Sequence, residues 1–475
     1  MGLRSRWSVP FLAVLFLAKA GAAQTQGRPP ASAPPSATPP ATAPPSAMPP
    51  GVLQSPGQAP GAPAPAPSGV QKLTLADAEK IAVQNHPQLQ IAEHRAAYAK
   101  AQEQEARAAY SPQVTGDLTG VYAETNSRIT AGALSNPHIF DRFSSGAFVT
   151  QLITDFGRTQ SLVKSSSQHA QAQAAGVITS RADILLQVHE AYYGSLKSKA
   201  LLTVAQETVK DRQVISDQVT LMAQNKLKSG LDVAFANVDL AQARLLLIQA
   251  QNDLQVSYAN LSTALGYHEP QSFELSELPV PPAPPPDFVP VLQEAFLNRP
   301  ELVGQRFEVN AAHSYAIAER DLWFPTLGAI GAAGVAPYRE DMLTSTRYAV
   351  AGFNMSIPIF NGHLFGSLRT QAKEEYRAQQ QYLRDLEDRI ARDVRTAWLN
   401  SISAYERLAV TEQLLQEATL AEDLAASRYK MGLSSIVELS QAQLNLTQAQ
   451  IQEASAKYDF QARMSELQYQ QGLLR

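Results

Sequence analysis

The strongest constraint on the fold is an internal duplication whose two copies begin and end with the same proline-containing motifs. Residues 85–89 read Asn-His-Pro-Gln-Leu, and residues 298–302 read Asn-Arg-Pro-Glu-Leu. A second pair of motifs, around Pro112 and Pro325, closes the helical patterns that the first pair opens. The two pairs have identical spacing along the chain, so the two halves should share one plan of helix, strands and long helices.

The first residues have the composition of a secretory signal. Arg4 and Arg6 supply positive charge, residues 11–18 form a short apolar stretch, and small residues at 18–23 offer cleavage sites. The apolar stretch is shorter than a membrane-spanning helix requires, which disfavours the alternative of an N-terminal membrane anchor. We therefore predict that residues 1–23 are removed during export.

Composition excludes several classes of protein. The chain has no cysteine, so disulfides, catalytic thiols, thiolate metal sites and a lipid-bearing N-terminal cysteine are ruled out. A net charge of −4 gives no electrostatic support for a nucleic-acid partner. Charged residues make up only 17% of the chain, below the usual quarter, as expected of helices that pack closely through small residues.

Proline-rich stretches divide the chain. Residues 24–72 combine proline with Ala, Ser and Thr, a composition that cannot bury a core and favours polyproline II or disorder. A spacer is the simplest interpretation, and a docking segment for a cell-envelope partner is the alternative. A second proline run at 279–290 separates the halves. The predicted repeats are therefore residues 73–278 and 291–475.

Long helices dominate both repeats, because proline is absent between Pro137 and Pro270 and after Pro358 and apolar residues recur at helical spacing there. A helix of about 65 residues would be on the order of 100 Å long. Gly230 and Gly432 each follow a long helix, so each repeat should contain a helical hairpin turned by that glycine. The predicted helices are 75–109, 158–226, 232–265, 290–322, 363–429 and 435–470.

Segments with a two-residue period lie between the first helix and the hairpin of each repeat. They predict strands at 114–122, 148–153, 327–335 and 352–357, with polar loops at 123–144 and 336–346. Alternating apolar and polar residues fit a membrane β-barrel with a wet interior. Four strands cannot close such a barrel, and an open sheet in lipid would leave unsatisfied edges. Either the strands form a soluble sheet, or several chains contribute to one barrel; only the second interpretation explains the adjoining long helices.

The folded region, residues 73–472, resembles the TolC-type outer-membrane efflux protein family. The similarity rests on the duplicated motifs, the hairpin turns and two further matched pairs of segments, 154–157 with 359–362 and 190–193 with 396–399. It implies a mainly α fold with a small β part, in which a homotrimer forms a twelve-stranded β-barrel in the outer membrane of a Gram-negative bacterium and a helical barrel in the periplasm. The breaks between strands and helices would lie at Pro112, Gly157, Pro325 and Gly362.

The resemblance also implies a function and partners. The chain would be the passive exit duct of a tripartite efflux pump, together with a periplasmic adaptor (membrane fusion) protein and an inner-membrane RND, ABC or MFS transporter. A duct for type I protein secretion or heavy-metal efflux is an alternative within the family. From a different class, a periplasm-spanning coiled-coil tether or trimeric adhesin would explain the helices but not the duplication, the strands or the matched turns.

Gating residues follow from the family pattern, which places acidic side chains six and nine positions after the second turn glycine. These positions are Glu438 and Gln441, so one ring of three carboxylates is expected where the family has two. A carboxylate ring favours cations. The first turn has Ala236 at the spacing of Glu438, and the gate is therefore expected to be asymmetric.

Tyr429 matches a position that helps to latch the closed state in the family, and Asp232 and Asp239 are candidate partners for it. The helical tips are the expected docking points for the adaptor. The tip residues are Ser229, Gly230, Leu231, Met431, Gly432 and Leu433.

Nothing in the sequence points to catalysis. The eight histidines are scattered, with no HExxH motif and no paired metal-ligand spacing, and no glycine-rich phosphate loop precedes a helix. We expect neither an enzyme nor a bound cofactor or metal.

Overall fold

The computed structural model describes residues 72–122, 141–338 and 345–474, so the predicted signal segment and nearly all of the first linker lie outside the described residues. Every described element belongs to one compact unit. In chain order the elements are β1 (Lys72–Leu73), α1 (Leu75–Asn85), α2 (Pro87–Ala108), β2 (Gln113–Val121), β3 (Arg142–Thr154), α3 (Arg158–Gln224), α4 (Gly230–Ala264), β4 (Glu274–Leu275), α5 (Phe288–Asn298), α6 (Pro300–Arg320), the 3-10 helix η1 (Asp321–Trp323), β5 (Thr326–Tyr338), β6 (Arg347–Ser356), α7 (Leu364–Lys430) and α8 (Ile436–Gln470).

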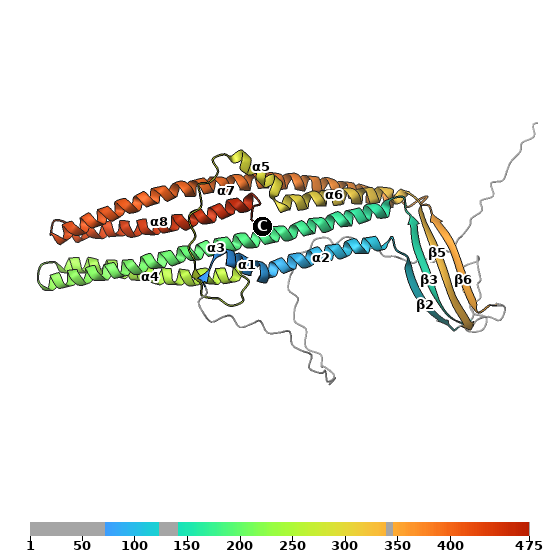
Figure 1. Cartoon of the computed structure of the whole chain (residues 1–475), viewed down its shortest axis with the longest axis horizontal. Helices are drawn as coiled ribbons and strands as arrows, with labels where there is room; N and C mark the ends of the chain where they lie inside the picture. Colours follow the sequence, from blue (N-terminus) through green and yellow to red (C-terminus); the bar gives the residue numbers. More distant parts are fainter. Residues whose placement is uncertain (1–71, 123–140, 339–344, 475) are drawn as a thin grey trace, which may run out of the picture. The chain divides into compact units, whose positions relative to one another are not determined.

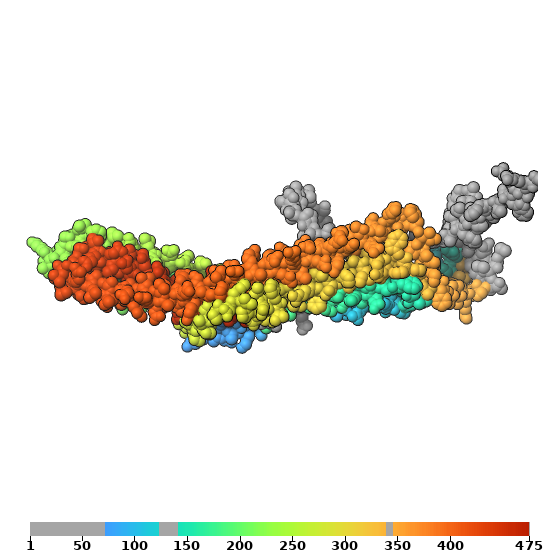
Figure 2. Space-filling model, turned by 90° about the horizontal axis from the view of Figure 1, so that it is seen from above, coloured from blue at the N-terminus to red at the C-terminus, as the bar shows by residue number. Residues whose placement is uncertain are grey.

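Two helices of 67 residues, α3 and α7, form the frame of the helical part (Figure 1). Shorter helices lie along each half of them: α2 and α4 pack against α3, α6 packs against both α3 and α7, and α8 does the same. Each repeat thus contributes one long helix and a set of half-length helices to a single layer. Figure 2 shows one face of this layer, on which α7 (orange) lies beside α5 and α6 (yellow).

The helices pack through small residues at seven-residue intervals, which is the repeat of a coiled coil. Small side chains at these positions let the helix axes approach closely. Within the described ranges, no helix combines the length and apolarity needed to cross a bilayer. The buried positions with this spacing include Ala236, Ala243 and Ala250 in α4, and Ala397, Ala404, Thr411, Ala418 and Ala425 in α7.

The single helices predicted at 75–109 and 290–322 are each two helices, and the Asn-x-Pro motifs supply the physical reason. α1 and α2 meet at His86, and α5 and α6 meet at Arg299. Both residues have extended backbones, because the residue before a proline is disfavoured in the helical region.

Each of these breaks receives the C-terminal end of a returning helix. Gly266 follows α4 with φ of 81°, and Gly472 follows α8 with φ of 72°. A Cβ added to Gly266 would lie 3.0 Å from the backbone of Asn85, and one added to Gly472 would lie 2.8 Å from the backbone of Asn298. The duplicated motif therefore marks the place where two half-length helices meet beside a long one.

The predicted strands are confirmed as one antiparallel sheet with the order β2-β3-β5-β6 (Figure 1). β3 begins at Arg142 and β5 continues to Tyr338, so parts of both predicted loops are strand. The other loop residues are either outside the described residues or flank the strands. β2 and β6 are the two edges of the sheet, and neither edge is paired within the described part of the chain.

The two repeats do not keep one spacing along their whole length. Elements before the second strand of each repeat keep the spacing of the duplicated motifs, as shown by Pro87 and Pro300, the first residues of α2 and α6. The helical hairpins of the two repeats are separated by a shorter stretch of sequence, as shown by Arg158 and Leu364, the first residues of α3 and α7. Matching hairpin helices have equal lengths, 67 residues for α3 and α7 and 35 for α4 and α8. The change in spacing therefore lies between the first strand and the long helix of each repeat.

A belt near the middle of the helices joins each repeat to its flanking segments. β1 and β4 form a parallel two-stranded sheet that is too short to show a period in the sequence. The Tyr192 hydroxyl lies 2.9 Å from the carbonyl of Leu73 and 2.7 Å from that of Ser276, and so ties both strands to α3. Trp398 is the equivalent residue of α7 and donates to the carbonyl of Pro285 at 2.9 Å.

Candidate gate and docking site at the helical tips

The two hairpin turns have the same geometry but not the glycine that the sequence suggested for the first one. In the second turn Gly432 adopts the left-handed conformation with φ of 72°, as predicted. In the first turn Lys226 does so with φ of 60°. Gly230 does not end α3; it is the first residue of α4, after the N-cap residue Ser229. The prediction that Gly230 turns the chain is therefore wrong.

This register changes which residues of the two tips are equivalent. Lys226 matches Gly432, and the N-cap residues Ser229 and Ser435 match each other with the same spacing. The equivalent of Glu438 is therefore Asp232 rather than Ala236, and both carboxylates lie in the first turn of their helices. The expected asymmetry, with a carboxylate in only one of the two tips, is wrong.

The two equivalent carboxylates have different partners. Asp232 forms a capping box, since its carboxylate accepts from the backbone N–H of Ser229 at 2.9 Å while the Ser229 hydroxyl accepts from the Asp232 N–H. Glu438 forms an ion pair with Arg428 of α7 at 3.3 Å, and its side chain is 42% exposed. Asp232 is thus held by the N-terminus of its own helix, whereas Glu438 is paired with a neighbouring helix and remains partly exposed to solvent.

Gln441 lies one turn further along α8 and donates to Asn445 of the same helix at 3.0 Å. It makes a local polar contact and carries no charge.

Tyr429 connects the two hairpins. It is buried near the end of α7, and Lys228 from the other turn lies 3.9 Å from the centre of its ring, within the range of a cation–π contact. Burial raises the pKa of the Tyr429 hydroxyl, and the negative charge of Asp232 raises it further. The hydroxyl has no hydrogen-bond partner within the described part of the chain.

Further contacts join the two hairpins near Tyr429. The Ser440 hydroxyl donates to Asp239 at 2.5 Å, linking α8 to α4. An apolar cluster with members on all four helices lies between the hairpins. Its buried members are Val219, Ala236, Ala425, Tyr429, Ile436 and Leu439.

Arg212 is an unusual member of the same interface. It is buried on α3 at a seven-residue position between Ala205 and Val219, and its guanidinium donates to Thr447 of α8 at 3.4 Å. Burial lowers the pKa of Arg212, while nearby carboxylates, Asp239 foremost, oppose that shift. Arg212, Asp239 and Thr447 together form a polar layer between the first and second hairpins.

The predicted tip residues form the exposed ends of the hairpins. Leu231, Met431 and Leu433 are each about two-thirds exposed, at 66%, 65% and 66%. Leu227, which sequence reasoning did not select, is 73% exposed beside them. The end of the helical layer is therefore an apolar surface, which is typical of a protein-interaction site.

The predicted breaks between strands and helices lie where the chain changes element. Pro112 immediately precedes β2 and Pro325 immediately precedes β5. Gly157 and Gly362 both have positive φ, of 107° and 61°. The true equivalent of Gly157 is His363, the N-cap of α7 with φ of 68°, so this match in the sequence was shifted by one residue.

Comparison with known proteins identifies the family once this geometry is known. The profile described as outer membrane efflux protein matches residues 80–267 and 291–470, one range in each repeat. The chain belongs to the outer membrane efflux protein family. It is an efflux channel of the TolC type, located in the outer membrane of a Gram-negative bacterium.

Individual relatives of the channel are distant but cover most of its length. The outer membrane efflux protein BepC of Brucella suis is 22% identical over 74% of this chain and 75% of BepC. The alkaline protease secretion protein AprF of Pseudomonas aeruginosa is 22% identical over 85% of each chain. The solved outer-membrane channel OprN shares the fold with a TM-score of 0.75, at 17% identity over 84% of this chain and 89% of OprN.

Sequence reasoning missed four residues that hold the hairpins of this efflux channel together. Arg212, Lys228 and Ser440 contact the other hairpin. Arg428 pairs with Glu438 inside the second hairpin. Only Arg212 had a visible signal, because its charge interrupts a series of small residues at seven-residue spacing. The others could not be selected without the rotation of each helix about its axis.

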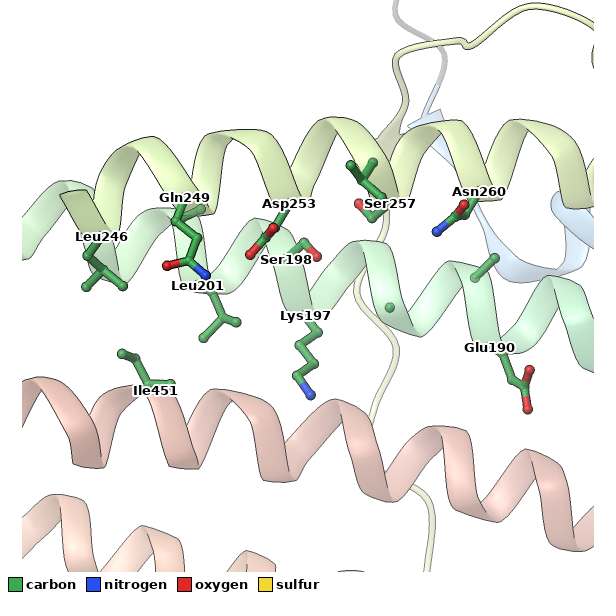
Figure 3. A pocket seen from close by; sticks show the side chains of 14 residues that line it. Glu190, Lys197, Ser198, Leu201, Leu246, Gln249, Asp253, Ser257, Asn260 and Ile451 are labelled. Atoms are coloured by element: carbon green, nitrogen blue, oxygen red, sulfur yellow. The ribbon is translucent and has the colours of Figure 1, made fainter. Parts of the chain in front are cut away.

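A groove farther from the tips is lined by α3, α4 and Ile451 of α8 (Figure 3). It has a volume of about 600 Å³ and is open to solvent. Lys197 of α3 points toward α8, where it pairs with Asp459 at 2.9 Å. Across the described ranges, no group of three or more His, Asp or Glu residues is arranged to hold a metal ion.

Proposed function

We propose that this efflux channel acts as a homotrimer and as the passive exit duct of a tripartite assembly. The observation that carries the proposal is a four-stranded sheet with two unpaired edges that continues directly into a layer of very long helices. A sheet with open edges is not viable in lipid. Three copies would supply twelve strands, within the range of closed membrane barrels.

The channel would perform no covalent chemistry. It would lower the barrier for polar solutes by replacing lipid with water, and the energy and direction of transport would come from its partners. We propose a periplasmic adaptor protein at the tips and an inner-membrane transporter of the RND, ABC or MFS class behind it. The apolar surface of Leu227, Leu231, Met431 and Leu433 supports docking at the tips.

Trimer formation and conduction can be tested on the purified protein. We expect a mass three times that of the mature chain in native mass spectrometry, and steady ohmic channels in planar bilayers. A stable monomer, or a trimer with no conductance in any state, would overturn the proposal and favour a structural tether or adhesin.

Docking can be tested by site-specific crosslinking, because the chain has no cysteine of its own. A photocrosslinker attached to Leu231→Cys should capture the adaptor in intact cells, and one attached to Tyr382→Cys, an exposed site on α7 far along the sequence from the tip, should not. Equal capture at the two sites would argue against docking at the tips.

Glu438 is the proposed gate carboxylate, and its ion pair with Arg428 makes the gate testable in two directions. Glu438→Gln should weaken block by a divalent cation added at the tip side, and Arg428→Ala should strengthen it. We expect changes of about two- to fivefold, since exposed ion pairs are worth about 0.2–1 kcal/mol. Shifts in the same direction would remove Glu438 from this role.

We propose that the cargo consists of small molecules. Polypeptides are the second candidate, because the relative AprF is named for protease secretion. Deleting the gene should lower resistance to several unrelated drugs if small molecules are exported. A loss of one secreted protein, with resistance unchanged, would favour the second candidate.

A further inference from the structure

One acidic side chain lies within the four-stranded sheet, far from either end of its strand. The charged residues of these described strands are Asp117, Arg142 and Arg347. The two arginines are the first residues of β3 and β6. Asp117 is the central residue of β2, is exposed, and forms no ion pair within the described ranges.

The face that carries Asp117 is set by the alternation of β2. Glutamine, threonine and aspartate occupy the odd positions 113–119, while valine, glycine and leucine occupy the even positions 114–120. Successive side chains of a strand point to opposite faces, so Asp117 lies on the polar face of β2. In a closed barrel this face would line the lumen, because a carboxylate facing lipid at mid-height would be destabilising.

The strand register places Asp117 in one row with two glycines and a tyrosine. Asp117 is paired with Gly146, Gly146 with Gly334, and Gly334 with Tyr348 across the four strands. All four residues therefore belong to the same face of the sheet.

The side chain of Tyr348 extends over Gly334, and its hydroxyl reaches the space between Gly334 and Gly146. A Cβ added to Gly334 would lie 2.5 Å from the Tyr348 hydroxyl oxygen, and one added to Gly146 would be closer still. The ring therefore extends from β6 over β5, and the hydroxyl oxygen lies between Gly334 of β5 and Gly146 of β3. Adjacent strands are about 4.8 Å apart, so the hydroxyl lies between one and two strand spacings from the strand that carries Asp117. Tyr348 is 43% exposed, so part of the residue faces solvent.

We infer that Asp117 and Tyr348 form a cation-binding wall site inside the β-barrel, and that it favours organic cations. A carboxylate supplies charge, and an aromatic ring in the same row of this face supplies cation–π attraction; together they suit an alkylammonium group large enough to contact both. The site rests on the proposed trimer, which would contain three copies at one level. Arg142 lies on the same face four positions away at the strand end, and Arg347 lies on the opposite face.

The test uses the full-length trimer in planar bilayers, with a KCl gradient and tetraethylammonium added on the β-barrel side. Asp117→Asn should lower the permeability ratio of potassium to chloride and raise the half-blocking concentration of tetraethylammonium by about two- to fivefold, as for the loss of one exposed ionic contact. Asp117→Glu should keep both properties.

Tyr348 variants separate the ring from the hydroxyl. Tyr348→Phe should retain the block by tetraethylammonium, whereas Tyr348→Leu should weaken it by about three- to tenfold through loss of the cation–π contact. Thr119→Ser, a neutral change on the same face of β2, is the matched control and should leave the block unchanged.

The outcomes distinguish this inference from the proposed function. If the wild-type protein forms no trimer or no channel, the proposed function fails. If it conducts normally and Asp117→Asn changes neither selectivity nor block, only the cation site fails. Native mass spectrometry of each variant confirms that a changed current comes from an assembled trimer.

Discussion

A buried tyrosine with an unpaired hydroxyl is the most informative single residue at the tips. Tyr429 fills the space between the hairpins, contacts Lys228 through its ring, and leaves its oxygen without a partner in the described structure. An unpaired buried hydroxyl costs about 1–3 kcal/mol. Shape and polarity therefore have opposite effects on stability at this position.

Replacing Tyr429 should separate these effects. Tyr429→Phe should leave the thermal stability of the channel unchanged or raise it, because the ring and its cation–π contact remain. Tyr429→Ala should cost about 3–5 kcal/mol, as for other large aromatic deletions. Thermal denaturation followed by circular dichroism measures both; a large loss in Tyr429→Phe would show that the hydroxyl has a partner in the assembled protein.

At the scale of elements, the two hairpin turns use one backbone geometry with different residues. Lys226 has a left-handed backbone that costs a non-glycine residue about 1–2 kcal/mol. Gly432 adopts the same conformation without that cost. The first turn is therefore the strained copy.

Substituting the left-handed residue of each turn should change the stability of the two hairpins in opposite directions. Lys226→Gly should stabilise the first hairpin by about 1 kcal/mol, and Gly432→Ala should destabilise the second by a similar amount. Hydrogen exchange of the adjoining helix ends measures each turn separately. Equal effects of the same sign would contradict the assignment of the strained turn.

The packing of α3 on α6 should depend on pH. His169 of α3 forms an ion pair with Glu308 of α6 at 2.8 Å, and the hydrogen bond to Glu308 raises the pKa of His169 above its usual 6.5. Because the folded state holds the proton more tightly, the ion pair contributes fully below about pH 6.5 and is lost as pH rises through the raised value. His169→Gln should therefore lower the melting temperature at pH 6 but much less at pH 9.

Much of the helical architecture could be predicted from the sequence, because absence of proline and helical spacing act over many residues. The ends of α3 and α7 lie within a few residues of their predicted positions. The proline that causes the break between α1 and α2, Pro87, was also visible in the sequence. The sequence pattern alone does not distinguish a proline in the first turn of a new helix from a proline inside one longer helix.

The equivalence of the tip residues could not be predicted in the same way. A glycine is the usual left-handed residue, and Gly230 lies only four positions from Lys226, so the choice of Gly230 shifted the comparison of the tips. Hydrogen bonds from the backbone N–H groups of Lys226 and Leu227 to the end of α3 hold the lysine in that conformation. Only the three-dimensional structure shows that Asp232 and Glu438 are equivalent.

At the scale of the whole molecule, the sheet and the tips should differ in their dependence on assembly. β2 and β6 have unpaired edges in the described chain, whereas the hairpins contain their own apolar cluster. Local stability follows the number of contacts that opening must break.

Hydrogen exchange of dilute, detergent-dissociated protomers and of trimers tests this difference. Amides of β2 and β6 should become strongly protected on assembly, while amides in the middle of α3 should change little. Strands that are equally protected in both forms would mean that the sheet does not close through its neighbours.

The equal lengths of the two hairpins also limit how this protein can change its reach. The distance from the sheet to the tip is set by α3 and α7, and the distance from the tip to the breaks at His86 and Arg299 is set by α4 and α8. A seven-residue insertion in one of these four arms would shift its tip contacts relative to those of the others. The chain has tolerated a change of length only within the strand hairpins, where the two repeats lose the spacing of their proline motifs. A lineage that meets a wider periplasm must therefore lengthen all four arms by matched coiled-coil repeats, or obtain the extra length from its partners.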